Sequence, residues 1–295
     1  MTQPITGLWV ACATPLEAGG GVDHAALVRH GARLLAGGCD GLVLFGTTGE
    51  GPSFTAAERL ATVEALLASG IAPTRLALGT GGPAIGEAVA LIRGALSLGL
   101  VHALILPPYY FRDATEQGIG DAFAAVLDGV NDARLRATLY HIPQVSGVAV
   151  PPAEVARLRG HYGAMLAGVK DSSADFPQFL AFRAAAPEVA VLVGNEADIA
   201  QARAAGGAGT ICGMANLVPD LVRAMFTDSA AAEPTMRAAI GLMEAPFIPT
   251  MRAVLAAQTG EAGWRLPRLP FRPATAETGT RIAGALARLG VRKAA

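Results

Sequence analysis

The chain has 295 residues, of which 52% are hydrophobic and 16% are charged, and its formal net charge is −1. This length and composition fit a globular α/β protein with a large core, built as one large domain or two smaller ones. A net charge near zero lacks the basic surface of proteins that bind nucleic acid or anionic membranes, so we expect neither partner. Three scattered cysteines without CxxC spacing, and an N-terminus without a basic signal-peptide region, favour a cytoplasmic location.

Short apolar runs alternate with longer amphipathic segments along most of the chain. The runs that we expect to be strands are 8–14, 41–45, 75–79, 103–106, 137–141, 165–170, 190–194 and 209–212. The helical patterns between them are 23–37, 55–69, 84–98, 115–128, 151–159, 175–186 and 196–205. Near-continuous apolar strands separated by helices indicate a parallel sheet with both faces covered. Eight such units without a wide break favour a closed (β/α)8 barrel over an open sheet, and we place this barrel at residues 1–220.

The strand pattern stops after Val218. Helical patterns follow at 216–227, 231–244, 246–260 and 277–290, with a segment rich in proline and arginine at 265–273. We therefore predict a C-terminal helical domain at residues 221–295.

Only two of the 23 cationic Lys and Arg residues are lysines, Lys170 and Lys293. Lys293 lies in the C-terminal tail, where either cation would serve, whereas Lys170 ends an apolar run that we expect to be a buried strand. A lysine can lose its proton and act as a primary amine when it is desolvated, while a guanidinium stays charged. A neutral amine at a strand end can form an imine with a carbonyl compound. The alternative is a structural lysine whose amine reaches solvent from the end of the strand.

The other unusual residues also follow predicted strands. In a barrel of this kind the carboxyl ends of the strands and the loops after them form the active site. These ends carry 46-GTTGEG-51, 107-PPYY-110, 140-YHIP-143, 170-KDSS-173 and 194-GNE-196. Three of the four tyrosines lie there, and a phenol near an amine can transfer protons. Turn and capping chemistry is the alternative for Thr47 and Thr48, and packing at the edge of the core is the alternative for Tyr110 and Tyr140.

In combination these motifs, together with 209-GTICGMAN-216, resemble the pyruvate-dependent class I aldolases and lyases. That family includes dihydrodipicolinate synthase, N-acetylneuraminate lyase and the 2-keto-3-deoxy-sugar-acid aldolases. The resemblance extends from Gly7 to the C-terminal helices. It implies a (β/α)8 barrel with C-terminal helices, a homotetramer, and catalysis through a covalent imine without a metal or organic cofactor. The five histidines also lack the spacing of a metal site, so we expect no metal.

The resemblance also implies roles for particular residues. Lys170 would form the imine with pyruvate or a related 2-oxo acid. Tyr140 would move protons, and Thr47 would link it to Tyr110 of a neighbouring subunit. Thr48, Gly194 and Ile211 would contact the substrate. Beyond the resemblance, we expect three further residues to contact it: Ser172, Glu196 and His141. His141 replaces a common asparagine, and the alternative for its ring is a structural role at the end of a strand.

Departures from the family bear on the substrate. Dihydrodipicolinate synthases have an arginine after the fifth strand that binds the carboxylate of the aldehyde, and Val145 occupies that position here. A branched apolar side chain cannot make a bidentate contact with a carboxylate. Ala197 likewise replaces an acidic residue that sialic-acid lyases have after strand seven. We therefore expect a lyase that cleaves or forms a carbon–carbon bond next to pyruvate, acting on 2-keto-3-deoxy sugar acids with an uncharged hydroxyaldehyde as acceptor. The alternatives are dihydrodipicolinate synthesis and, from another class, a non-catalytic 2-oxo-acid sensor.

Overall fold

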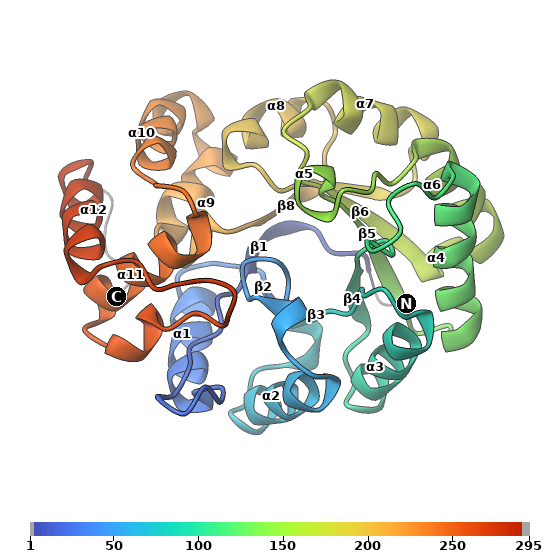
Figure 1. The fold of residues 1–295 in the computed structure, drawn as a ribbon. Helices are drawn as coiled ribbons and strands as arrows, with labels where there is room; N and C mark the ends of the chain where they lie inside the picture. Colours follow the sequence, from blue (N-terminus) through green and yellow to red (C-terminus); the bar gives the residue numbers. More distant parts are fainter. Residues whose placement is uncertain (1–2, 291–295) are drawn as a thin grey trace. The chain divides into compact units, whose positions relative to one another are not determined.

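A computed structural model of the chain describes residues 3–290 (Figure 1). Its eight strands form a closed barrel in the order β1 to β8. Their bounds are β1 Gly7–Ala11, β2 Gly41–Leu44, β3 Leu76–Gly79, β4 His102–Ile105, β5 Arg136–His141, β6 Leu166–Asp171, β7 Ala190–Val193 and β8 Gly209–Cys212. Every predicted strand is present, and the predicted (β/α)8 barrel with C-terminal helices is confirmed.

Helices follow the strands as the amphipathic pattern predicts. Those between the strands are α1 His24–Ala36, α2 Ala56–Ala68, α3 Ile85–Ser97, α4 Glu116–Val130, α5 Pro143–Ser146, α6 Pro152–Tyr162, α7 Phe176–Ala185 and α8 Ile199–Ala204. Those after the barrel are α9 Pro219–Thr227, α10 Ser229–Gly241, α11 Phe247–Thr259 and α12 Ala276–Arg288. Helix α2 begins at the expected capping box, in which Thr55 and Glu58 exchange side-chain and backbone hydrogen bonds. Helix α5 was not predicted from the sequence, because four residues are too few to show a helical period.

Backbone contacts group the chain into two compact units that interleave along the sequence. The first unit holds the residues up to Trp9 together with 72–212, and the second holds Val10–Ile71 together with the residues from Gly213 onward. Neither unit coincides with the division at residue 220, which was based on where the strand pattern ends. That division stays a prediction.

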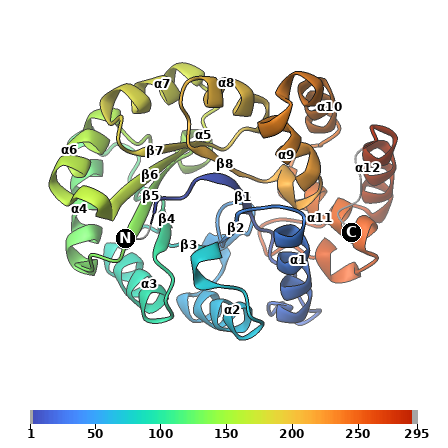
Figure 2. The ribbon, with the colours of Figure 1, turned by 180° about the vertical axis from the view of Figure 1, so that it is seen from behind.

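In the first unit, β3 to β8 pair in parallel. Helices α3, α4, α6 and α7 pack against one another in chain order and lie outside these strands (Figures 1 and 2). The strands are buried along almost their whole length, which explains their continuous apolar sequence. The register pairs Tyr140 of β5 with Lys170 of β6, so the parallel pairing places these two candidate residues side by side.

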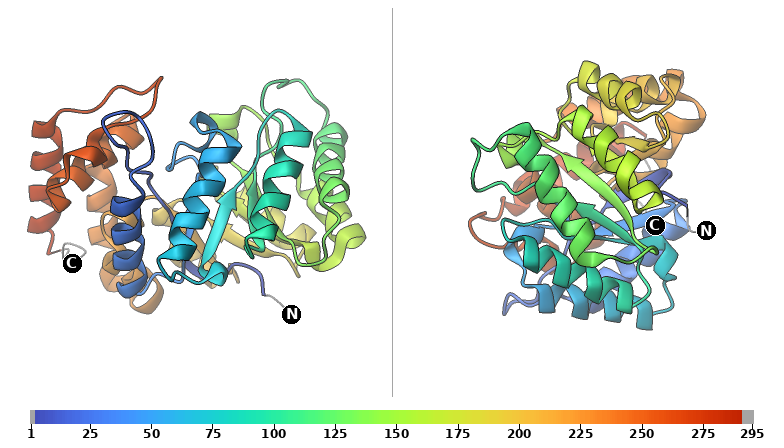
Figure 3. Two further views of the ribbon diagram at one scale, coloured as in Figure 1. Left: turned by 90° about the horizontal axis from the view of Figure 1, so that it is seen from below. Right: turned by 90° about the vertical axis from the view of Figure 1, so that its right-hand side faces the viewer.

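In the second unit, α1 packs against α2, α9 against α10, and α11 against α12. Figure 3 shows α11 and α12, at the red end of the colour scale, lying next to each other. Asn216 is completely buried and joins several segments of this unit: its side-chain amide donates to the carbonyl of Ala11, and its oxygen accepts from the backbone N–H of Ala13 and contacts His30. Among residues 3–290, no helix has both the length and the apolar character needed to span a bilayer.

Candidate active site

Lys170 lies one residue before the end of β6 and is 3% exposed. Its Nζ lies 4.1 Å from the centroid of the Tyr140 ring, and Tyr140 is also buried. Within the described part of the chain, Lys170 forms no ion pair with any carboxylate. This is unusual for a buried charged group, because such groups are normally paired. A buried amine beside an aromatic ring and without a carboxylate partner suits a group that reacts as a nucleophile.

Gly194 lies directly against this lysine and against Ser172. A Cβ atom on Gly194, directly after β7, would lie 1.9 Å from Oγ of Ser172 and 3.2 Å from Cε of Lys170, so any larger residue would force these side chains to move. The backbone N–H of Gly194 donates to the carbonyl of Asp171 at 2.6 Å, which fixes the backbone at this point. The carbonyl of Ser172 accepts a hydrogen bond from Nε2 of Gln144 at 2.6 Å. The structure therefore brings together Lys170, Tyr140, Ser172 and Gly194, and their roles in catalysis stay predictions.

His141 makes contacts that serve the fold. Its Nδ1 accepts a hydrogen bond from the backbone N–H of Val150 at 3.0 Å, and its ring packs edge-on against Phe182 of α7. Burial lowers the pKa of His141 to about 4, a shift that the nearby charge of Asp175 partly opposes. These contacts support the alternative of a structural ring over the expected contact with substrate.

The remaining candidates of the first unit differ in exposure. Ile211 of β8 is fully buried, and Glu196, the first residue of a 3-10 turn over Glu196–Asp198, is 9% exposed. Tyr110 is 74% exposed and packs edge-on against the exposed ring of Phe111, with 5.2 Å between ring centroids. The role of Tyr110 in a neighbouring subunit stays a prediction.

The turn after β2, residues 46–51, belongs to the second unit and carries Thr47 and Thr48. Its shape is tightly constrained, because a Cβ atom on Gly51 would lie 1.9 Å from the carbonyl oxygen of Phe45. Phe45 and Glu50 both have φ near +55°, a left-handed conformation that is unfavourable for residues other than glycine. Thr48 is 9% exposed, and its Oγ1 would lie 3.4 Å from a Cβ atom on Gly213. The strain and the close approach distinguish this turn from an ordinary surface loop.

Glu50 of this turn forms a buried ion pair with Arg252 of α11, in which both side chains are at most 1% exposed. From the sequence, Glu50 stood out only as part of a motif, and Arg252 was not predicted as a functional residue. A usable signal was present, because Arg252 interrupts the apolar run of α11 and a buried arginine requires an acidic partner.

Val145 lies in α5 and is 59% exposed. Two residues further on, Gly147 has φ +70°, and a Cβ atom on it would lie 2.7 Å from Nε of Arg112. The guanidinium of Arg112, from the loop between β4 and α4, thus lies beside the loop in which the family arginine is absent. Within residues 3–290 Arg112 has no carboxylate partner.

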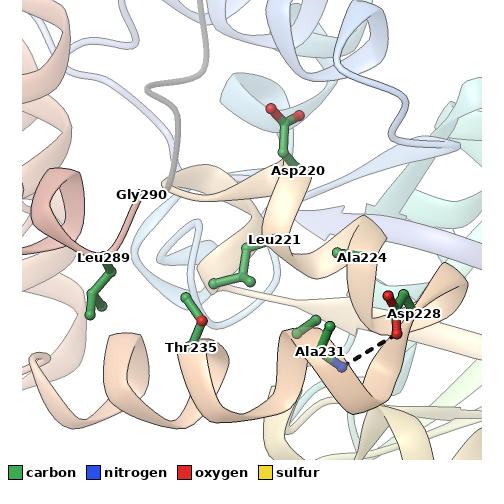
Figure 4. A pocket seen from close by; sticks show the side chains of 9 residues that line it. Asp220, Leu221, Ala224, Asp228, Ala231, Thr235, Leu289 and Gly290 are labelled. Atoms are coloured by element: carbon green, nitrogen blue, oxygen red, sulfur yellow. Dashed lines mark hydrogen bonds between the residues drawn. The ribbon is translucent and has the colours of Figure 1, made fainter.

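A separate pocket of about 460 Å³ lies in the second unit (Figure 4). It is lined by residues of α9 and α10 and the end of α12: Asp220, Leu221, Ala224, Asp228, Ala231, Ala232, Thr235, Leu289 and Gly290. Asp228 serves as the cap of α10, since its side chain accepts from the backbone N–H of Ala231. The pocket offers neither an amine nor a phenol, so it does not suit imine chemistry. Among residues 3–290 no cluster of His, Cys, Asp and Glu is arranged to hold a metal ion.

The sequence profile of the dihydrodipicolinate synthetase family matches residues 4–288. The chain belongs to this family. A DapA-like lyase of Chloroflexus aurantiacus, described as uncharacterized, is 36% identical over 92% of this chain and 93% of its own length. The 4-hydroxy-tetrahydrodipicolinate synthase 1 of Streptomyces coelicolor is 34% identical over 95% of this chain and 92% of its own length.

Solved structures of the family share the fold. The dihydrodipicolinate synthase of Agrobacterium tumefaciens superimposes with a TM-score of 0.90 at 33% identity, covering 97% of this chain and 99% of that one. As a member of the dihydrodipicolinate synthetase family, the chain is a lyase of the class I aldolase type.

Proposed function

We propose that this lyase forms an imine between Lys170 and a 2-oxo acid, pyruvate in the simplest case, and makes or breaks the adjacent carbon–carbon bond. The observation that carries the proposal is the buried Lys170 amine, 4.1 Å from the centroid of the Tyr140 ring and without a carboxylate partner in residues 3–290. Nζ attacks C2 of the 2-oxo acid, and the carbonyl oxygen leaves as water. The protonated imine then withdraws electrons from C3, which loses a proton to give an enamine. The enamine carbon adds to the aldehyde carbon, the aldehyde oxygen takes up a proton, and hydrolysis frees the product and Lys170.

Other candidate residues take supporting roles in this proposal. Tyr140 transfers protons at C2 and at the new hydroxyl, in a relay with Thr47 and Tyr110. Thr48 and the backbone of Thr47 bind the carboxylate of the 2-oxo acid. Gly194 and Ile211 line the site through their backbones, and the side chains of Ser172 and Glu196 contact the substrate. In this proposal, catalysis needs no metal or organic cofactor. The enzyme acts as a homotetramer in the cytoplasm.

For the substrate, we propose a 2-keto-3-deoxy sugar acid whose cleavage releases pyruvate and an uncharged hydroxyaldehyde. Val145 supports this choice, because its side chain cannot bind a second carboxylate. The direct experiment is a pyruvate-release assay over a panel of 2-keto-3-deoxy acids. Borohydride reduction with pyruvate, followed by peptide mass spectrometry, should place the adduct on Lys170. A label on Lys293 alone would contradict the mechanism, and binding without turnover of any panel member would favour a sensor.

The second candidate is 4-hydroxy-tetrahydrodipicolinate synthesis from pyruvate and aspartate semialdehyde. Two observations favour it: similarity to relatives such as the 4-hydroxy-tetrahydrodipicolinate synthase 1 of Streptomyces coelicolor, and Arg112, which lies beside Gly147 and has no carboxylate partner in residues 3–290. The two candidates differ in kcat/KM for aspartate semialdehyde compared with glyceraldehyde. If aspartate semialdehyde is the better acceptor, and Arg112→Ala removes that preference, then Arg112 supplies the missing cation and the imine mechanism stands with a different substrate.

A further inference from the structure

Two arginines of the C-terminal segments hold the turn after β2 through one carboxylate. Oε1 of Glu50 accepts a hydrogen bond from Nε of Arg252 at 2.5 Å and forms an ion pair with Nη2 of the same guanidinium. Oε2 of Glu50 accepts from the backbone N–H of Arg268 at 2.7 Å. Both carboxylate oxygens are therefore occupied, and the turn is joined to α11 and to the chain that follows it.

The same guanidinium reaches the turn by a second route. Arg252 donates to the carbonyl of Thr14 through Nη2 and to the carbonyl of Trp264 through Nη1, the latter at 3.2 Å. Oγ1 of Thr14 in turn donates to the carbonyl of Gly49 at 3.0 Å. Arg252 thus fixes two consecutive residues of the turn, Glu50 directly and Gly49 through Thr14.

The turn requires such support because its backbone is unfavourable in isolation. Glu50 has φ +55° and ψ 32°, the left-handed conformation that residues with a Cβ atom rarely adopt. Strained backbone of this kind persists where surrounding contacts over-determine it. A buried ion pair adds little net stability compared with well-packed apolar residues. The reason for an arginine inside the apolar run of α11 is then geometric: it holds the turn in one shape.

We propose that Arg252 is a positioning residue of the reaction, which acts through Glu50 to hold Thr47 and Thr48 where they bind the 2-oxo-acid carboxylate. The inference rests on the proposed function, in which that turn is the carboxylate site. A lysine cannot replace the guanidinium, because one ammonium group on a flexible stem cannot serve Glu50, Thr14 and Trp264 in a fixed geometry.

The test compares Arg252→Lys and Glu50→Gln with wild type and with Met236→Ala. Met236 is completely buried in α10, outside the turn and outside α11, so we expect its truncation to destabilise the C-terminal helices. The measurement is the pyruvate concentration that gives half-maximal borohydride trapping on Lys170, with circular dichroism and Tm for each variant. We expect both turn variants to raise this concentration roughly tenfold or more and to reach full trapping at saturation, since a misplaced binding group weakens substrate positioning. Met236→Ala should lower Tm and leave the concentration unchanged.

Two results would overturn the inference, and they are distinguishable from failure of the proposed function. A half-saturating concentration within twofold of wild type in the folded variants means that the pair only stabilises the fold. If Met236→Ala raises the half-saturating pyruvate concentration as much as the turn variants do, the effect again comes from lost stability of the fold. If Arg252→Lys does not fold, the half-saturating concentration of Glu50→Gln tests the inference alone. We expect this variant to fold, because glutamine keeps the size of the side chain and one acceptor oxygen. Absence of any adduct in the wild-type protein would instead refute the imine mechanism itself.

Discussion

Two buried cations, Lys170 in the first unit and Arg252 in the second, lie in opposite kinds of surroundings. Arg252 is fully buried and donates to a carboxylate and two backbone carbonyls. Lys170 is 3% exposed, lies over a tyrosine ring and has no carboxylate partner among the described residues. A guanidinium stays charged and can be buried only if its donors are paired, whereas a primary amine without a carboxylate partner has a nitrogen that can react as a nucleophile. The surroundings of Arg252 therefore suit a structural role, and those of Lys170 suit the proposed role as a nucleophile.

Lys170→Arg breaks the comparison most directly, because it gives the proposed imine-forming position a guanidinium that cannot form an imine. We expect kcat to fall by roughly 10³-fold or more, with complete loss of borohydride trapping, since the nucleophile is removed. Single-turnover kinetics and peptide mass spectrometry measure both effects. Lys293→Arg is the matched control and should keep full activity, and residual adduct in Lys170→Arg would show that another group is the nucleophile.

Tyr140→Phe keeps the ring beside Lys170 and removes only the hydroxyl. General acid–base groups typically contribute about 10²- to 10⁴-fold, so we expect kcat to fall by about 10²-fold while trapping on Lys170 persists at a lower rate. Tyr162→Phe is the control, because the Tyr162 hydroxyl bonds Asp128 and the carbonyl of Ala124 on α4. Equal activity in Tyr140→Phe and wild type would limit Tyr140 to a packing role.

Gly194→Ala tests whether the close approach at the end of β7 matters for the lysine. The added Cβ would lie 1.9 Å from Oγ of Ser172, so the neighbours must move, and we expect the rate of imine trapping to fall roughly tenfold. Gly160→Ala is the control, since a Cβ there meets nothing within 4 Å and the helix gains about 0.5–1 kcal/mol from the better helix former. An unchanged trapping rate in Gly194→Ala would mean that this glycine has no part in shaping the site.

The smallest effect concerns an ion pair near the surface of the second unit, between Glu58 and Arg268. Hydrogen bonds from Arg268 and Thr55 lower the pKa of Glu58 to about 2. A carboxyl with a lowered folded-state pKa contributes stability above its unfolded pKa near 4.5, and that contribution disappears as the pH falls towards 2. Urea unfolding should show Glu58→Gln about 1 kcal/mol less stable than wild type at pH 7, with the difference shrinking below pH 4. A difference that does not change with pH would mean that packing, not charge, is lost.

The fold could be predicted from the sequence, whereas the buried polar network around Glu50 and Arg252 could not. Apolar runs predicted all eight strands, and amphipathic periodicity predicted the four C-terminal helices, because each pattern is long enough to be recognised. Helix α5 was not predicted, because its four residues are too few to show a helical period. Residue economy singled out Lys170, because chemistry distinguishes lysine from arginine even before any neighbour is known.

The sequence by itself determined the order of strands and helices and singled out Lys170 and Tyr140 at the ends of their strands. The strand register of the structure then showed that these two residues are paired. Only the tertiary structure decided which polar residues meet across long stretches of chain. Glu50 and Arg252 are 202 positions apart, and no local spacing encodes their ion pair. The structure likewise placed Arg112 beside Gly147 and gave His141 a backbone partner. The physical reason is that periodicity reports which face of an element is buried, while the partner of a buried polar group depends on how distant elements pack.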